Sequence, residues 1–229
     1  MVQDLSLAKT LTPVAYLWTR TVKCPNPACG ASVPLVRQTW LCKKTKKCVA
    51  LKVIPNYQTK RVEFEVVEAT TEKALGFDPA VGSARGTSTC RHCGTTVKSN
   101  AVKEQGKAGR IGQQLMAIVC TNPDSQGKTY LSSDEYRHYV PDKAAIELRL
   151  DQLCQETGLT IPNEPIFSGD TRAFFTHLYG LDNFGKLFTH RQLLSLMRFV
   201  KWIRLAHEKM MQQGYEEEFG KAIATYSSC

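Results

Sequence analysis

The sequence predicts an α+β fold, with an antiparallel β-rich N-terminal part followed by a helical C-terminal part. Apolar residues alternate with polar ones early in the chain, which is typical of half-buried strands, and recur every three or four residues near its end, which is typical of helices. Two close cysteine pairs lie in the first part and predict that it contains a zinc ribbon. We therefore expect a zinc-ribbon β-rich domain at 12–131 and a helical region at 132–229.

Three early segments of the chain have the period of strands. In the third of them, Val62, Phe64 and Val66 alternate with glutamates, as in a strand with one face in the core and one in water. A turn over 56–60 would join this strand to the preceding one as a hairpin. The expected strands are 14–22, 48–54 and 61–69.

The middle of the chain combines loops with two more strands. Segment 70–87 is rich in Gly, Pro, Ala and Thr, and we expect a mobile excursion there that lets the distant cysteine pairs meet. The basic stretch 97–114 predicts a helix or a turn. Strands at 115–121 and 128–132 should follow, and the residues from Ser132 to Asp134 can cap a helical turn.

Helix signals dominate the rest of the chain. Pro141 opens a predicted helix that Gly158 ends, and Thr189 with Gln192 forms a capping box before a helix that ends at Gly214. One face of that helix is apolar, and its residues are Leu193, Leu196, Met197, Val200 and Ile203. The final amphipathic stretch, 215–229, has an apolar face with no evident partner in the chain.

The four paired cysteines carry the strongest chemical signal. Cys24 and Cys29 lie in CPNPACG, and Cys90 and Cys93 lie in CRHCG, so each pair is in a tight turn with glycine after the second thiol. Zn²⁺ binds four sulfur ligands tetrahedrally, and C-x-x-C-G is typical of such a site, whereas C-x-x-x-x-C is a less common spacing. Because 60 residues separate the pairs, a single site requires the intervening chain to fold back as hairpins. Four thiolates leave no open position for water, so we expect structural zinc without catalysis.

The cysteines also allow other interpretations. In a reducing compartment they can be ordinary buried apolar residues, and in an oxidising one they can form disulfides or a redox pair. Nine is an odd number, and the first residues lack a charged cap followed by an apolar core, so we do not expect secretion. No apolar run approaches the roughly 20 residues that span a bilayer, so we expect a cytoplasmic protein with no membrane partner.

The balance of charge favours a polyanionic partner. Thirty Lys and Arg against 21 Asp and Glu give a formal net charge of +9, with DNA as the first candidate, although such a surplus can also serve solubility alone. For the basic cluster in the predicted hairpin, a solvated tip is an equal alternative to phosphate contact. The candidate nucleic-acid contacts are Lys43, Lys44, Lys46 and Lys47 in that hairpin, and Lys103, Lys107 and Arg110 beside the second cysteine pair.

No catalytic or cofactor-binding residue can be assigned. The glycine run at 106–112 fits neither common phosphate-binding motif and precedes a strand, so we expect a basic, flexible turn. The five histidines are scattered, and His92 is flanked by thiols that are better placed as ligands. Trp18, Trp40 and Tyr57 could stack on bases, but aromatic residues in strands near a zinc site are more often core.

Three stretches of the chain, in this order, carry a resemblance: VAYLWTRTVKCPNPACGASVPLVRQTWLCKK, CRHCG with GKAGRIGQQLMAIV, and LYGLDNFGKLFTHRQLLSL. They resemble the middle of large prokaryotic proteins described as adenine-specific DNA methylases that contain a zinc ribbon. The resemblance implies that the two cysteine pairs are the ligands, and Cys42 stands where the family usually has serine. The family's S-adenosylmethionine loop and Asp-Pro-Pro-Tyr motif are absent, and Asn122-Pro123-Asp124 lacks the second proline and the aromatic residue.

Three functions follow as hypotheses. The first is an accessory or target-recognition part of an adenine-specific DNA methyltransferase, which binds DNA and is not catalytic by itself. Its helical region would be a truncated docking surface for a methyltransferase core, and S-adenosylmethionine would be bound only by a catalytic half supplied in trans or in the full-length protein. The second is a zinc-stapled protein–protein interaction module, and the third is a complete enzyme, which the missing cofactor loops disfavour.

Overall fold

A computed structural model confirms the α+β fold and describes residues 2–4, 9–84, 86–123, 126–137, 140–167 and 175–228, with side chains from residue 11 onward. The chain divides into two compact units. Unit 1 consists of Met1–Val140 with Leu178–Gly180, and unit 2 consists of Pro141–His177 with Leu181–Cys229. Residues 132–140, which we expected to begin the helical region, therefore belong to the β-rich unit.

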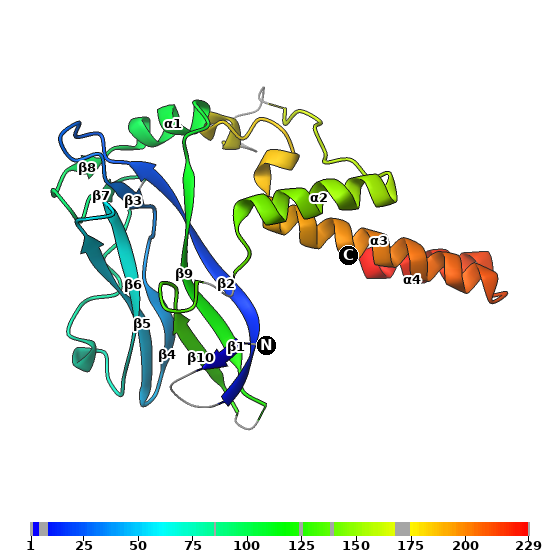
Figure 1. Cartoon of the computed structure of the whole chain (residues 1–229), viewed down its shortest axis with the longest axis horizontal. Helices are drawn as coiled ribbons and strands as arrows, with labels where there is room; N and C mark the ends of the chain where they lie inside the picture. Colours follow the sequence, from blue (N-terminus) through cyan, green and yellow to red (C-terminus); the bar gives the residue numbers. More distant parts are fainter. Residues whose placement is uncertain are drawn as a thin grey trace. The chain divides into compact units, whose positions relative to one another are not determined.

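The larger sheet of unit 1 has five antiparallel strands (Figure 1). The strands pair in the order β1-β2-β9-β10, and β3 pairs beside β2. Their bounds are β1 Val2–Asp4, β2 Lys9–Lys23, β3 Ser32–Pro34, β9 Gly112–Thr121 and β10 Lys128–Ser132. The pairing of β2 with β9 shifts register twice, so the long strand bends along its length.

The second sheet follows the predicted alternation of apolar and polar residues. It has three antiparallel strands: β4 Trp40–Lys44, β5 Lys47–Asn56 and β6 Arg61–Ala69. On β6, Val62 and Phe64 are buried whereas Glu65 is exposed, as the sequence predicts for a strand with one face in the core. The turn between β5 and β6 occupies the predicted hairpin position.

The two sheets pack on a shared apolar core and are also joined by polar side chains. Leu51 and Phe64 from the small sheet pack with Ala117 of β9. At the free edge of β6, the Val66 N–H donates to Ser132 Oγ at 3.0 Å, and the Phe64 N–H donates to Asp134 Oδ2 at 3.4 Å. Residues that we expected to cap a helical turn therefore cap a strand edge, which satisfies backbone groups that would otherwise lack partners.

The described residues of 70–87, where we predicted a mobile excursion, form hydrogen bonds and apolar contacts with the rest of unit 1. The short 3-10 helix η1, Lys73–Leu75, buries Leu75 beside Cys48. The Thr39 N–H donates to the Pro79 carbonyl at 2.8 Å, and the Ser83 N–H donates to the Val36 carbonyl at 2.6 Å. The segment therefore returns the chain to the second cysteine pair along a path fixed by hydrogen bonds.

The glycine run 106–112 contains a turn at 108–109, as we predicted, and its first glycine also serves close packing within a helix. Helix α1, Ser99–Lys107, includes Gly106, whose Cα lies so near the Tyr179 carbonyl that any Cβ would collide with it. Gly180, at φ +77°, lies equally close to the Gly106 backbone. These contacts attach residues 178–180 to unit 1.

Unit 2 is helical, with α2 at Lys143–Thr157, α3 at His190–Gln212 and α4 at Glu217–Ser228. Short 3-10 helices, η3 at Thr176–Tyr179 and η4 at Gly185–Leu187, precede α3. The predicted capping box is present: Thr189 accepts from the Gln192 N–H, and the Gln192 side chain accepts from the Thr189 N–H. Gly158 ends α2 at φ +64°.

The core of unit 2 is small. Leu150 and Leu153 of α2 pack with Leu193 and Met197 of α3. Helix α4, which we expected to lack a partner, packs against α3, because Gly220 leaves space for Met211 and His207. No helix in the described ranges is long and apolar enough to cross a membrane.

Candidate metal centre

The first cysteine turn lies between β2 and β3. The Cys24 N–H donates to the Ala31 carbonyl at 2.8 Å, which closes the turn. Inside it, the Asn26 carbonyl accepts from the N–H groups of Cys29 at 3.0 Å and Gly30 at 3.1 Å. Gly30 has φ +59°, a conformation that a side chain disfavours, and this explains the glycine after the second thiol.

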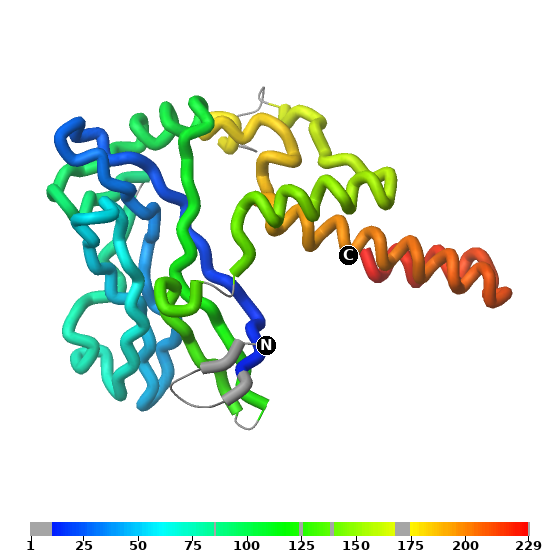
Figure 2. The backbone as a smooth tube through the Cα atoms, viewed as in Figure 1, coloured from blue at the N-terminus to red at the C-terminus, as the bar shows by residue number. Residues whose placement is uncertain are grey.

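The second cysteine turn repeats this design between β7, Ser88–Thr89, and β8, Thr96–Val97. The Cys90 N–H donates to the Thr95 carbonyl at 3.0 Å, and the Gly94 N–H donates back to the Cys90 carbonyl at 2.9 Å. Gly94 has φ +73°. Each turn therefore presents two sulfur atoms from a backbone that is held by its own hydrogen bonds. Figure 2 shows the first turn in blue and the second in green in the same part of unit 1.

The structure brings the four predicted sulfur atoms together. Cys24 Sγ lies 3.6 Å from Cys93 Sγ, Cys29 Sγ lies 3.8 Å from Cys90 Sγ, and all four atoms lie within 4.8 Å of one another. Four thiolates at the usual zinc–sulfur bond length of about 2.3 Å, placed tetrahedrally, would be about 3.8 Å apart. The four cysteines could therefore hold one metal ion, with two ligands from each turn.

The intervening chain folds back as the sequence required. The small sheet of β4, β5 and β6 and the segment after it occupy the 60 residues between the pairs, so the second turn returns to the first. None of the eight cysteines within the described residues is in a disulfide. The Cys24 and Cys93 sulfur atoms, 3.6 Å apart, are far beyond the roughly 2.05 Å of a disulfide bond.

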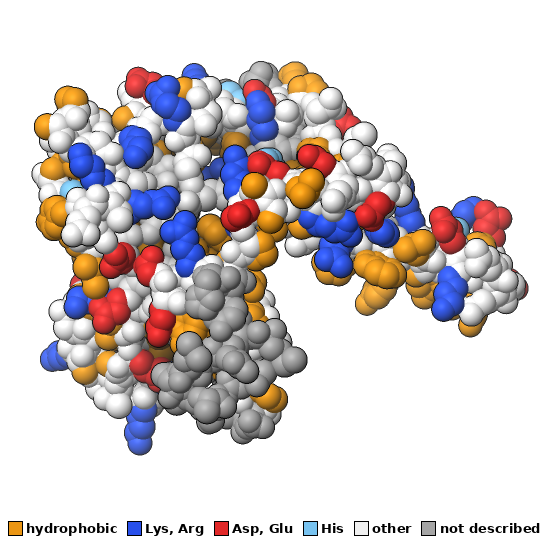
Figure 3. All heavy atoms as spheres, viewed as in Figure 1, with side chains coloured by type: hydrophobic (Ala, Val, Ile, Leu, Met, Phe, Trp, Pro, Cys, Tyr) orange, Lys and Arg blue, Asp and Glu red, His pale blue; other side chains and the backbone are white. Residues whose placement is uncertain are grey.

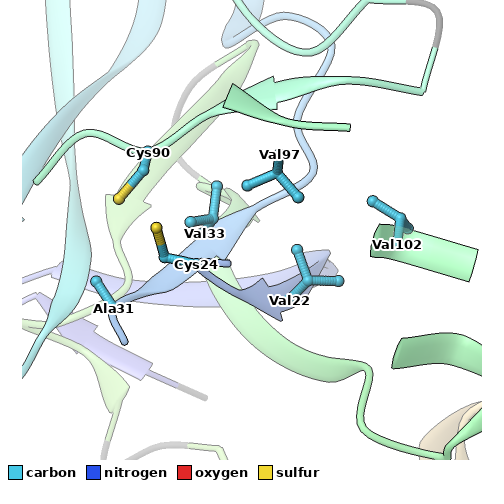
Figure 4. Packing of buried hydrophobic residues seen from close by; sticks show 7 residues of the cluster. All are labelled: Val22, Cys24, Ala31, Val33, Cys90, Val97 and Val102. Atoms are coloured by element: carbon cyan, nitrogen blue, oxygen red, sulfur yellow. The ribbon is translucent and has the colours of Figure 1, made fainter. Parts of the chain in front are cut away.

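The site lies against an apolar cluster that buries two of its thiols. Cys24 and Cys90 are 6% and 1% exposed and point toward one another beside Val33 and Val97 (Figure 4). Burial raises the pKa of Cys24 to about 12 and also raises the pKa of Cys90. Without a cation, both thiols therefore favour the protonated form.

The exposed member of the site has the opposite preference. Cys93 Sγ lies 3.2 Å from Thr95 Oγ1, and hydrogen bonds from the Thr95 hydroxyl and backbone N–H lower the pKa of Cys93 to about 6. The group thus combines an easily ionised thiol with two that ionise readily only beside a positive charge. A soft divalent ion provides that charge and bonds thiolates directly.

His92, inside the second turn, bonds to a different element. Its Nε2 lies 3.1 Å from the Asn56 carbonyl oxygen, and its ring packs edge-on with Tyr57 at a centroid distance of 5.3 Å. Its Nδ1 is buried with no hydrogen-bond partner in the described part of the chain. His92 therefore connects the second cysteine turn to the β5–β6 turn, a role that its spacing in the sequence could not indicate.

The structure separates the two predicted basic clusters. On the hairpin, Lys43 pairs with Glu72 at 2.9 Å and Lys47 pairs with Glu68 at 3.4 Å. Only Lys44 and Lys46, near the tip, lack such a partner among the described residues, and Lys46 has φ +61°. Half of the hairpin cluster is therefore already neutralised.

The second cluster lies on α1 and just after it, beside the four-sulfur site. Across the ranges that the structure describes, Lys103, Lys107 and Arg110 form no ion pair. Four more basic residues at this end of unit 1 also form no ion pair with a described residue, namely Lys23, Lys60, Arg91 and Lys98. Figure 3 shows Lys and Arg side chains spread over the α1 end of unit 1, whereas acidic side chains gather where β4, β5 and β6 lie.

The other candidate residues do not join the site. Cys42 and Cys48 lie on β4 and β5, outside the four-sulfur group. Trp18 and Trp40 pack against apolar clusters, as expected for core aromatics, whereas Tyr57 is 68% exposed. Asp124, of the Asn-Pro-Asp sequence, lies outside the described residues.

Comparison of the chain with family models, curated proteins and solved structures finds no match. The resemblance to the zinc-ribbon DNA methylases therefore stays a prediction from the three sequence stretches. What this chain can bind is inferred from the geometry of the cysteine site and from the charges around it.

Proposed function

We propose that unit 1 is a structural zinc module that presents a basic surface to DNA. On this proposal, the chain is an accessory or target-recognition part of an adenine-specific DNA methyltransferase. The observation that carries it is the concentration of unpaired Lys and Arg side chains around the four-sulfur site. A metal ion there would hold together the two turns from which this surface extends.

Zinc is the ion that fits the donor set best. All four donors are sulfur, two of their separations, 3.6 and 3.8 Å, are close to the tetrahedral value, and no histidine or carboxylate belongs to the group. Structural zinc sites are closed, four-coordinate and often of this type. Bound there, the ion would supply folding energy and fix both turns, and it would leave the chemistry of methyl transfer to other residues.

DNA is the polyanion that the basic surface suits. Lys103 and Lys107 are one helical turn apart on α1, and Arg110 follows the helix. The side chains can contact neighbouring phosphates, which adds affinity that does not depend on base sequence. Methyl transfer would require a catalytic half that binds S-adenosylmethionine, supplied in trans or by the full-length protein, since no such motif is present in this chain.

The test is the salt dependence of duplex DNA binding by the zinc-loaded chain. We expect the triple substitution Lys103→Gln, Lys107→Gln and Arg110→Gln to weaken binding and to lower the slope of log K against log salt by about 2–3, because each lost phosphate contact removes about 0.9. Fluorescence anisotropy at several salt concentrations measures this slope.

A matched control removes the same number of charges from paired positions. Lys43, Lys47 and Lys52 each form an ion pair with a glutamate, at 2.9, 3.4 and 3.8 Å. Their replacement by Gln should leave the salt slope nearly unchanged. Equal effects of the two triple variants would refute the proposed DNA surface, since net charge alone would then explain binding.

A second candidate is favoured by the apolar surface of unit 2. Phe199 and Trp202 of α3 are 68% and 60% exposed, and Leu196 beside them is 45% exposed. Such a patch is typical of a protein-interaction site, and the partner on this view is the methyltransferase catalytic half. Replacing Phe199 and Trp202 by Ser should abolish co-elution with that half while DNA binding is kept. If DNA binding never depends on the α1 cluster, this candidate becomes the better one.

A further inference from the structure

Tyr57 lies in the turn between β5 and β6, and its side chain is 68% exposed. Single exposed apolar residues are common on protein surfaces, so exposure alone does not indicate a function. The structure of this turn, its connection to the cysteine site and its charge distinguish Tyr57 from an incidental surface residue.

The turn is held rigidly by Asn56. Its Oδ1 accepts hydrogen bonds from the N–H groups of Gln58 and Thr59, each at 3.0 Å, and its Nδ2 donates to Glu63 Oε1 at 2.5 Å. This arrangement fixes the backbone on both sides of Tyr57. A ring held in this way loses little conformational entropy when it binds.

The same turn is attached to both cysteine turns. The Ser32 N–H, which follows the first cysteine turn, donates to the Lys60 carbonyl at 2.8 Å. His92, inside the second, contacts the Asn56 carbonyl at 3.1 Å through Nε2. The His92 ring meets the Tyr57 ring at 74°, and such an edge contact uses at most one face of Tyr57. Because Tyr57 is 68% exposed, ring surface remains accessible for stacking.

The charge of the turn suits nucleic acid. Lys60 in the turn and Arg61 at the start of β6 are exposed, and neither forms an ion pair in the described part of the chain. An open aromatic face beside basic side chains is the combination with which proteins bind single strands, because the ring stacks on a base while the cations contact phosphates. In a closed duplex the base faces are covered by their neighbours, so a single ring on a turn has no face to meet.

We propose that Tyr57 stacks on an unpaired base of single-stranded or locally opened DNA. This inference rests on the proposed function of unit 1 as a DNA-binding module and adds the structural class of DNA that it prefers. The β5–β6 turn is a stacking element braced by both halves of the metal centre, and the α1 cluster supplies contacts that duplex and single strand share.

The experiment uses the full chain loaded with zinc, a labelled oligonucleotide of about 12 nucleotides and its duplex form. Tyr57→Leu should weaken single-strand binding about tenfold and leave duplex binding and the salt slope unchanged, whereas Tyr57→Phe should bind the single strand like wild type. Phe retains the ring, so the comparison isolates stacking from the hydroxyl.

The outcomes separate this inference from the proposed function. Salt-dependent binding that Tyr57→Leu leaves unchanged on the single strand would overturn the stacking role and leave the DNA-binding module intact. An equal loss on duplex and single strand would overturn it as well, since the leucine would then act through general damage to the surface. Wild-type protein that binds neither form would overturn both proposals.

Discussion

At the scale of residues, four thiols from two distant turns have unlike environments. Cys24 and Cys90 are buried and have raised pKa values, whereas Cys93 is exposed and its pKa is lowered to about 6 by Thr95. Without a cation, the two buried thiols favour the protonated form, whereas a bound metal ion favours the thiolate. A metal ion bound by these thiols would therefore couple metal binding, proton release and folding of unit 1.

The first prediction concerns a single ligand. Cys90→Ser should lower the metal content from about one ion per chain to near zero and unfold the β-rich unit, because a missing thiolate removes much of the metal-coupled folding energy. Cys42→Ser is the matched control, since Cys42 is half-buried outside the site. Elemental analysis and thermal melting measure both variants. Stoichiometric zinc and an unchanged melting curve in Cys90→Ser would contradict the assignment.

The second prediction concerns protons. At pH 7.5 the metal-free protein should hold the protons of Cys24 and Cys90, since burial raises both pKa values, whereas Cys93, at about 6, is already ionised. Zinc binds thiolates, so each ion should displace at least about two protons, and the association constant should rise about 100-fold per pH unit. Stability gained from the metal is therefore lost as pH falls.

Calorimetric titration with zinc in two buffers of different ionisation enthalpy measures the proton release. Cys42→Ser should release the same number of protons as the wild-type protein. If the zinc association constant stays the same over about one pH unit near neutrality, no thiol proton is displaced, and the buried thiols are not ligands.

At the scale of elements, glycines decide which segments can touch. Gly106 lets the backbone of α1 approach the Tyr179 carbonyl, and Gly220 lets α4 pack under Met211 of α3. Both contacts join segments that are separated in sequence, and neither produces a hydrophobic period. A glycine in a helix costs stability by itself, so packing explains its presence.

The third prediction follows from this contact. Gly106→Ala should destabilise unit 1 by about 1–3 kcal/mol, because the new Cβ would overlap the Tyr179 carbonyl and force the backbones apart, which outweighs the better helix propensity of alanine. Asn100→Ala, at an exposed position of the same helix, should change stability by less than about 0.5 kcal/mol. Urea denaturation followed by tryptophan fluorescence compares them. A stabilised Gly106→Ala would mean that the close contact is not made.

The strands and capped helices could be predicted because their signals are local. The alternation at Val62 and Phe64 identifies β6, and the capping box of Thr189 and Gln192 identifies the start of α3. The paths of 70–87 and of α4 could not, because each depends on contacts with distant residues. The Thr39–Pro79 hydrogen bond and the packing at Gly220 leave no mark in the neighbouring sequence.

The four cysteines of the candidate site could be predicted from the sequence, but their surroundings could not. The two cysteine turns carry their own glycines, so their spacing predicted the four sulfur atoms that the structure brings together. The link from His92 to the β5–β6 turn and the neutralisation of Lys43 by Glu72 depend on tertiary contacts. A count of charges along the sequence therefore overstated the free positive charge of the hairpin. The sequence also could not show that Tyr57 is exposed.

At the scale of the molecule, the four cysteines that could hold a metal ion all lie in unit 1. Unit 2 has its own small core of α2 and α3 and ion pairs of its own, such as Lys201 with Glu156 at 2.9 Å. The Arg149 and Lys201 side chains lower the pKa of Glu156, whose carboxylate accepts from both. The two units therefore have separate sources of stability.

The fourth prediction is that metal removal acts on one unit. A chelator should increase hydrogen exchange strongly in β2, β3, β7 and β8, because the two cysteine turns lose their common ion. Exchange in α2 and α3 should change little. Mass spectrometry of peptides from the chelated and zinc-loaded protein measures both, and restored zinc should reverse the change. Equal loss of protection in both units would show that they fold as one.

The most direct test of a four-sulfur zinc centre is X-ray absorption at the zinc edge of protein purified without added metal. We predict about one zinc per chain, with four sulfur neighbours at about 2.3 Å and no nitrogen or oxygen in the first shell. Absence of stoichiometric metal, or a shell that contains nitrogen or oxygen ligands, would contradict the assignment of Cys24, Cys29, Cys90 and Cys93 as the ligands.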